Sequence, residues 1–121
     1  MDKNFKKKRQ VVFEKYNGHC AYCGCEITFE NFHVDHIKPL LRGYRKNEVD
    51  KGTSKIDNLA PSCASCNCSK SDFTVERWRN ELELKKERIK RDVPTFNLLL
   101  RFGCIAEIDK PIIFYFEKFN K

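Results

Sequence analysis

The sequence predicts a small α+β protein whose fold is held together by a zinc ion. Two observations support this: two Cys-x-x-Cys pairs, and short strand-like segments flanked by segments with helical periodicity. The chain has 121 residues, which fits one domain. We therefore expect a single domain over 1–121, with a motif core at about 18–72 and an extension at about 73–121.

The composition excludes disordered and membrane-spanning proteins. Hydrophobic residues make up 40% of the chain and charged residues 34%, which is too apolar for disorder and too charged for a membrane protein. No segment reaches the roughly 18 uninterrupted apolar residues of a spanning helix. The basic amino terminus lacks the apolar segment of a secretory signal. We therefore expect a cytoplasmic protein without a membrane partner.

The charge balance is basic. The chain has 24 Lys and Arg against 17 Asp and Glu, a formal charge of +7. Such an excess suits a polyanion such as nucleic acid, although solubility alone also explains it.

The cysteines are more informative than the charge. There are seven, an odd number that fits a disulfide framework poorly, and the cytosol would keep them reduced. Two Cys-x-x-Cys pairs instead suit one tetrahedral zinc ion. The expected zinc ligands are Cys20, Cys23, Cys63 and Cys66, and the expected free thiols are Cys25, Cys68 and Cys104.

Local patterns predict four helices and two hairpins. The helices are expected at Phe5 to Tyr16, Asn67 to Ser71, Thr74 to Arg91 and Pro94 to Phe102. The first hairpin is expected between Ile27–Phe29 and Phe32–Ile37, and a terminal hairpin between Ile105–Ile108 and Ile112–Phe116.

Three spaced segments resemble the HNH endonucleases of the four-cysteine zinc type. They run from Phe32 to Leu40, from Ile56 to Leu59 and from Cys63 to Lys70. The resemblance implies a ββα-metal fold, in which a two-stranded hairpin and a helix hold one divalent cation near the scissile phosphate. It also implies a metal-dependent endonuclease that hydrolyses DNA phosphodiester bonds, in a small, phage-like member of the family.

The resemblance also assigns roles to individual residues. His36 matches the general base that deprotonates the attacking water, and Asp35 matches the metal ligand beside it. Asn67 matches the second metal ligand, and Asn58 matches the residue that holds the base or its loop in place. Because a carboxylate and an amide carbonyl are hard oxygen ligands, we expect Mg²⁺ or Mn²⁺ at this site.

The expected substrate is DNA, most simply the double-stranded form. Phosphate contacts are expected from the basic side chains of Lys70, Lys38, Arg42 and Arg45. The sequence leaves open a protein partner for targeting, a monomer or homodimer, and a choice between nicking and double-strand cleavage. It also leaves one rival function: a zinc-stabilised nucleic-acid-binding module without catalysis.

Overall fold

The computed structural model describes residues 3–40 and 52–119, and in it the chain forms two compact units. The first unit comprises 1–75 and 113–121, and the second comprises 76–112. The helices of the first unit are α1 (Lys3–Glu14), the 3-10 helix η2 (Ile56–Asn58), α2 (Ala64–Lys70) and α5 (Tyr115–Phe119). The second unit contains almost all of α3 (Val75–Asp92) and all of α4 (Pro94–Arg101).

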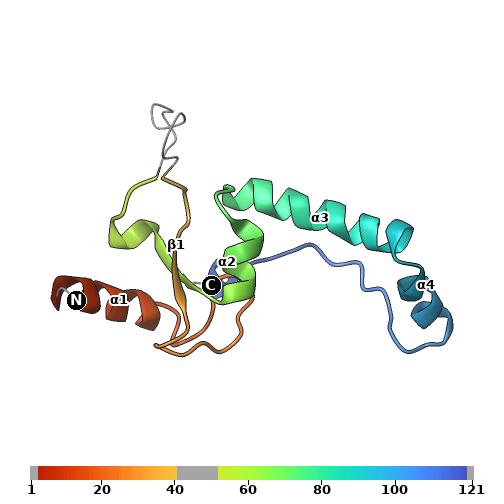
Figure 1. Ribbon diagram of the computed structural model, residues 1–121, viewed down its shortest axis with the longest axis horizontal. Coiled ribbons are helices and arrows are strands. Elements are labelled where there is room, and N and C mark those ends of the chain that lie inside the picture. Colours follow the sequence, from red (N-terminus) through yellow and green to blue (C-terminus); the bar gives the residue numbers. More distant parts are fainter. Residues whose placement is uncertain (1–2, 41–51, 120–121) are drawn as a thin grey trace. The chain divides into compact units, whose positions relative to one another are not determined.

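The sheet of the first unit has two antiparallel strands, β1 (His33–His36) and β2 (Leu59–Ser62) (Figure 1). In their register, Asp35 lies opposite Ala60 and His36 lies opposite Leu59. All four residues of β2 are buried, so this strand lies inside the unit although it contains Pro61. The helix α2 follows β2 after one residue. Two strands and one helix therefore form the ββα arrangement that the sequence predicts.

The pairing of the strands differs from the prediction. We expected β1 to pair with Ile27–Phe29, but that segment forms no strand. Residues 28–32 instead make a turn, in which Asn31 N and Phe32 N donate to Thr28 O. Arg9 on α1 donates to the carbonyls of Phe29 and Phe32. β1 pairs instead with β2, the buried strand from further along the chain.

The core of the first unit lies between α1 and the sheet. Val12, Phe32 and Leu59 form its buried centre. Five partly buried side chains pack against them: Phe13, Ile27, Phe29, Val34 and Ile56. The predicted helix at Phe5 to Tyr16 is thereby confirmed, with its ends shifted by two residues.

Three cations, two on α1 and Lys15 directly after its end, donate to backbone carbonyls elsewhere in the unit. Arg9 stacks 3.9 Å from the ring centre of Phe32 and binds the two carbonyls already named. Lys15 Nζ donates to the carbonyls of Ile56, at 3.0 Å, and Leu59, at 2.7 Å. Lys8 donates to the carbonyl of Ser54. Burial lowers the pKa of Lys15, against the attraction of Asp57.

The C-terminal segment returns to pack on the first Cys-x-x-Cys turn. Tyr115 N and Phe116 N donate to the carbonyls of Tyr22 and Ala21, at 2.9 and 2.7 Å. The rings of Phe114 and Tyr22 meet edge to face with centres 5.7 Å apart. Gly24 has φ +81°, and a Cβ there would lie 2.8 Å from the Tyr115 ring. Glycine is therefore required at this position, both for its backbone angle and for space.

The predicted terminal hairpin is wrong. Residues 102–114 contain no strand, and 115–119 form α5 instead. The backbone N–H groups expected to bond across the hairpin bond to Tyr22 and Ala21. In the second unit, the segment leading to Ile112 is tied to α3 by ion pairing of Lys90 with Glu107, at 2.6 Å, and by a hydrogen bond from Arg79 to Ile112 O.

The two long predicted helices of the second unit are confirmed within one residue at each end. Thr74 precedes α3, as expected for a capping position, and Pro94 begins α4. Within the described ranges, no helix is both long and apolar enough to cross a membrane.

Val12 provides a direct test of the core. It is fully buried, whereas its neighbour Val11 is 50% exposed. We expect Val12→Ala to lower the free energy of unfolding by about 2 kcal/mol, from lost apolar burial plus the cavity left behind. Val11→Ala is the matched control and should change it by less than about 0.5 kcal/mol. Urea denaturation measures both, and equal effects would show that α1 does not pack as described.

Candidate functional site

The four cysteines of the two Cys-x-x-Cys pairs come together in the first unit. The sulfur atoms of Cys20, Cys23, Cys63 and Cys66 all lie within 4.8 Å of one another. Cys23 Sγ and Cys63 Sγ are 3.8 Å apart. Four thiolates at this spacing suit one tetrahedral zinc ion.

Backbone N–H groups point at two of these sulfur atoms. Tyr22 N donates to Cys20 Sγ and Cys66 N donates to Cys63 Sγ, each at 3.4 Å. The pKa of Cys20 is lowered to about 4, first by a hydrogen bond from the Cys66 thiol and then by neighbouring backbone groups. The pKa of Cys66 is raised in turn by Cys20 and by burial. The thiolate form that a metal needs is thus already favoured at Cys20.

The three remaining cysteines are exposed. Cys25 lies beside the cluster: burial and the thiols of Cys23 and Cys63 raise its pKa to about 12. Its sulfur atom is not among the four that lie within 4.8 Å of one another.

A second site lies where β1 faces α2. A cavity of about 290 Å³ is lined by Asp35 and His36 from β1 and by Asn67 from α2, together with neighbouring residues of both elements. The strand and the helix therefore bring together the three residues for which the sequence predicts catalysis and metal binding. Adjacent strand residues ordinarily point to opposite faces. His36 is the last residue of β1, and it lines this cavity together with Asp35.

Asp35 is buried and its contacts fix its carboxylate. The hydroxyl of Tyr22 donates to Asp35 Oδ2 at 2.5 Å, and Lys70 Nζ lies 3.0 Å from the same oxygen. Burial, followed by the Asp35 charge, raises the pKa of Tyr22, so the phenol keeps its proton and acts as the donor. Both contacts reach Oδ2, which leaves Oδ1 as the atom available to a ligand.

The position of Lys70 differs from the sequence-based expectation. We expected it to contact a phosphate, but its side chain is fully buried and paired with Asp35. Its ammonium also donates to the carbonyl of His36 at 3.0 Å. A buried ammonium requires a partner charge, and Asp35 is that partner. In this structure Lys70 therefore joins α2 to β1 on the buried side of the site.

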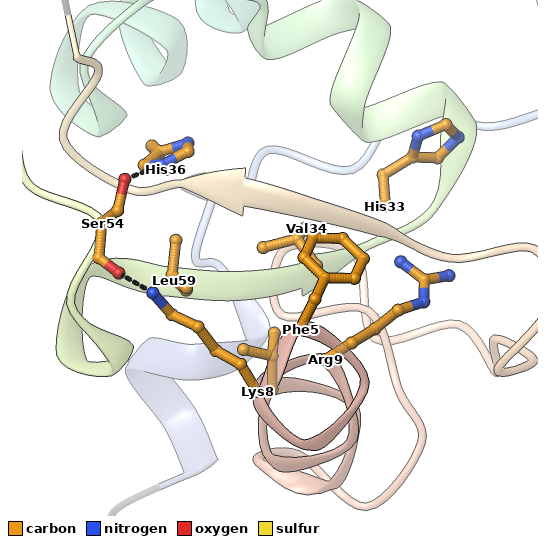
Figure 2. Close-up of a pocket in the computed structure, with 9 residues that line it drawn as sticks. Phe5, Lys8, Arg9, His33, Val34, His36, Ser54 and Leu59 are labelled. Atoms are coloured by element: carbon orange, nitrogen blue, oxygen red, sulfur yellow. Dashed lines mark hydrogen bonds between the residues drawn. The ribbon is translucent and has the colours of Figure 1, made fainter. Parts of the chain in front are cut away.

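His36 lies between two cavities. Besides the cavity with Asp35 and Asn67, it lines a second one on the α1 side of the sheet. Figure 2 shows its ring directed toward Ser54, and its Nε2 is 3.1 Å from Ser54 Oγ. Ser54 also receives the hydrogen bond of Lys8 at its carbonyl.

Asn58 closes the ends of the segment that follows β1. Its Oδ1 accepts from Lys38 N at 2.9 Å, and its Nδ2 donates to Lys38 O and Thr53 O at 2.9 and 2.7 Å. Its own carbonyl accepts from Ile37 N at 2.9 Å. The side chain thus ties the residue two places after His36 to the segment that carries Ser54.

Among the other expected phosphate contacts, Lys38 is exposed. Arg42 and Arg45 lie outside the described residues.

Comparison with known proteins agrees with this geometry. Residues 20–73 match the sequence model of the HNH endonuclease family. The protein YoqL of the SPbeta prophage in Bacillus subtilis strain 168, itself assigned to the HNH endonucleases, is 42% identical over 78 residues. That alignment covers 59% of this chain and 31% of YoqL.

Two Cas9 proteins also match. The CRISPR-associated endonuclease Cas9 of Corynebacterium diphtheriae is 31% identical over 85 residues, covering 70% of this chain and 7% of Cas9. The crystal structure of the Type II-C Cas9 of Actinomyces naeslundii superposes with a TM-score of 0.55 at 26% identity. It covers 68% of this chain and 8% of that one.

A ββα core beside a four-cysteine cluster therefore defines a domain of the ββα-metal class. Residues 20–73 form a domain of the HNH endonuclease family. The chain spans about a third of the length of YoqL and less than a tenth of either Cas9.

Sequence reasoning missed two residues of the site. Tyr22 lies inside the first Cys-x-x-Cys pair, at a position to which the motif assigns no role. Its hydroxyl nevertheless donates to Asp35. Ser54 follows the segment 41–51 and contacts His36. Nothing in the linear pattern indicates either contact, because each joins residues that are 13 or 18 positions apart.

The zinc cluster predicts which cysteines matter for folding. We expect Cys63→Ser to lose both bound zinc and cooperative unfolding, because structural zinc contributes its binding energy to folding. Cys68→Ser, in the same helix region but outside the cluster, is the matched control and should keep both. Zinc content by atomic absorption and thermal unfolding measure the outcome. Full zinc content in Cys63→Ser would contradict the assignment.

The buried pair of Lys70 and Asp35 gives a second expectation. Lys70→Met should lower the free energy of unfolding by about 3 kcal/mol, because Asp35 is then buried without its cation. The double variant Lys70→Met with Asp35→Asn should recover part of that loss, since no buried charge remains. Lys85→Met, at an exposed position of α3, should change stability little. Chemical denaturation measures all three, and a double variant no more stable than Lys70→Met would argue against the pairing.

Proposed function

We propose that this chain is a metal-dependent endonuclease that hydrolyses DNA phosphodiester bonds. The observation that carries the proposal is the single cavity shared by His36, Asp35 and Asn67. It supplies a base and two oxygen donors from two different elements at one place. Phosphodiester hydrolysis needs an activated water and a counter-charge for the phosphate, and these three side chains suit both tasks.

Asp35 and Asn67 would hold the divalent ion. A carboxylate and an amide carbonyl are hard ligands, which favours Mg²⁺ or Mn²⁺ over softer ions. The donor set fits, because Asp35 Oδ2 is already engaged by Tyr22 and Lys70 while Oδ1 can face the ion. When bound, such an ion offsets negative charge on the phosphate and on the departing oxygen.

His36 would act as the general base. Neutral imidazole is the side chain whose proton affinity suits proton transfer near neutral pH. The hydrogen bond between His36 Nε2 and Ser54 Oγ would hold the imidazole ring in position, since a hydroxyl can pair with either tautomer. Asn58 fixes the backbone on both sides of this pair.

Lys70 and Tyr22 would act as positioning residues for Asp35. Because both bind Oδ2, the carboxylate cannot rotate without breaking its bond to Tyr22 in the first Cys-x-x-Cys turn, its ion pair with Lys70 on α2, or both. This holds its other oxygen at one place relative to Asn67. The four cysteines would carry a structural zinc ion that fixes Tyr22 and the start of α2.

The substrate would be DNA held mainly by its phosphates. Lys38, Arg42 and Arg45 are the proposed contacts, with double-stranded DNA as the simplest substrate and a monomer, a homodimer or a targeting partner left open. Because one active site cuts one strand, we expect a single chain to nick DNA.

The decisive experiment is plasmid nicking with Mg²⁺, with Mn²⁺ and without added divalent ion. We expect His36→Ala to lose at least about 100-fold in rate, the size of a general-base contribution. Glu30→Ala is the control, since Glu30 is exposed and lines neither cavity. Zinc content and unfolding should be unchanged in both variants.

Asn67→Ala separates the ion-binding role from the base. It should raise the Mn²⁺ concentration needed for half-maximal rate, and excess Mn²⁺ should restore activity better than it does for His36→Ala. A protein that nicks equally well with His36→Ala would overturn the catalytic proposal. A wild-type protein that binds DNA and never cleaves it would establish the rival function, a zinc-stabilised binding module.

A further inference from the structure

A larger cavity lies on the other side of His36, between α1 and the sheet. Its volume is about 410 Å³. Figure 2 shows Phe5, Lys8 and Arg9 reaching it from α1, with His33, Val34 and His36 from β1 opposite them. The proposed catalytic chemistry uses only His36 among these residues, so the remainder of the cavity has no assigned role.

The surface of this cavity combines an apolar floor with a basic rim. Val12, Val34 and Leu59 supply the floor. Lys8, Arg9 and His33 stand around it, and none of the described residues that line it is acidic. Lys8 and Arg9 already donate to backbone carbonyls, which holds their positive charges at fixed places. A ligand with a flat apolar part and a negative group complements such a surface.

Phe5 is the most informative residue of the cavity. Its side chain is 51% exposed, although it lines the cavity. An exposed aromatic ring beside fixed cations is the pattern with which proteins bind single-stranded nucleic acid: the ring stacks on a base and the cations attract the phosphate. A core phenylalanine would instead be covered by its neighbours.

We propose that this cavity is a nucleotide subsite, in which Phe5 stacks on an unstacked base next to the scissile phosphate. The proposal rests on the proposed function, since His36 lines this cavity as well as the one with Asp35 and Asn67. A base in the α1-side cavity would place the adjoining phosphate near His36. The base comes from a single-stranded end or from a locally opened duplex, because a paired base keeps its faces covered by its neighbours.

The test compares binding of two oligonucleotides with the same number of phosphates. One is fluorescein-labelled hexathymidylate, and the other carries abasic nucleotides in place of the thymidines. Binding is measured by fluorescence anisotropy with the zinc-loaded full chain and without added Mg²⁺ or Mn²⁺, so that no cleavage occurs. We expect the wild-type protein to bind hexathymidylate at least about fivefold more tightly, the lower range for stacking one base.

Variants of α1 assign the preference to the ring. Phe5→Ala and Phe5→Leu should both lose the preference for bases, and Phe5→Trp should keep it. Val11→Ala is the matched control, because Val11 is on the same helix and equally exposed but does not line the cavity. Phe5→Leu keeps the apolar bulk, so its loss of preference cannot be assigned to unfolding of α1.

Equal binding of the two oligonucleotides by the wild-type protein would overturn the subsite. A base preference that survives in Phe5→Leu would do so too. These results are separable from the proposed function. If cleavage by the wild-type chain is intact, a missing base preference contradicts the subsite alone. If no cleavage is found, the base preference still reports whether the cavity binds a nucleotide.

Discussion

The ion pair between Lys70 and Asp35 joins the helix and the strand that line the candidate catalytic cavity. Lys70 ends the helix α2, Asp35 lies in β1, and Tyr22 attaches the same carboxylate to the first Cys-x-x-Cys turn. An ammonium without exposed surface is stable only while a carboxylate faces it. The position of Asp35 is therefore determined by three separate segments, and so is the cavity that contains His36 and Asn67.

The zinc cluster and the candidate catalytic cavity share one scaffold. Cys63 caps α2 by accepting from Cys66 N, and Asn67 follows one residue later on the same helix. Tyr22 lies between Cys20 and Cys23, and it reaches Asp35. A metal bound by the thiolates would hold both segments. It would thereby also fix the two oxygen donors, because Tyr22 bonds Asp35 and α2 carries Asn67. This arrangement suits a small unit with a limited apolar core.

The sequence allowed prediction of features that depend on local pattern. The helices at 3–14, 75–92 and 94–101 follow from apolar periodicity and from local start signals, Thr74 directly before α3 and Pro94 as the first residue of α4. The cysteine cluster follows from chemistry, since two Cys-x-x-Cys pairs have few other uses in one chain. Asp35, His36 and Asn67, to which the resemblance assigns roles, line one cavity.

The failures concern long-range pairing. Glu30 and Asn31 carry a good turn signal, yet β1 pairs with β2, whose Pro61 argues against a strand when the sequence is considered alone. Lys70 is a residue type that commonly contacts phosphate, but the orientation of its side chain depends on Asp35, which is 35 residues away in the sequence. The same holds for Ile112–Phe116, where strand propensity is overridden by packing on Tyr22.

Asn58 has a consequence for how such a domain can diversify. Its amide, together with the bond from Gly52 N to Pro39 O, fixes the points at which the chain leaves the sheet and returns to it. Gly52 allows this closure, because a Cβ there would overlap the carbonyl of Lys38. The free energy of closing a longer loop grows only slowly with its length. The bonds of Asn58 and of Gly52 therefore anchor both ends of the intervening segment. Segments of different length and charge can be accommodated between these anchors while the geometry around His36 is kept.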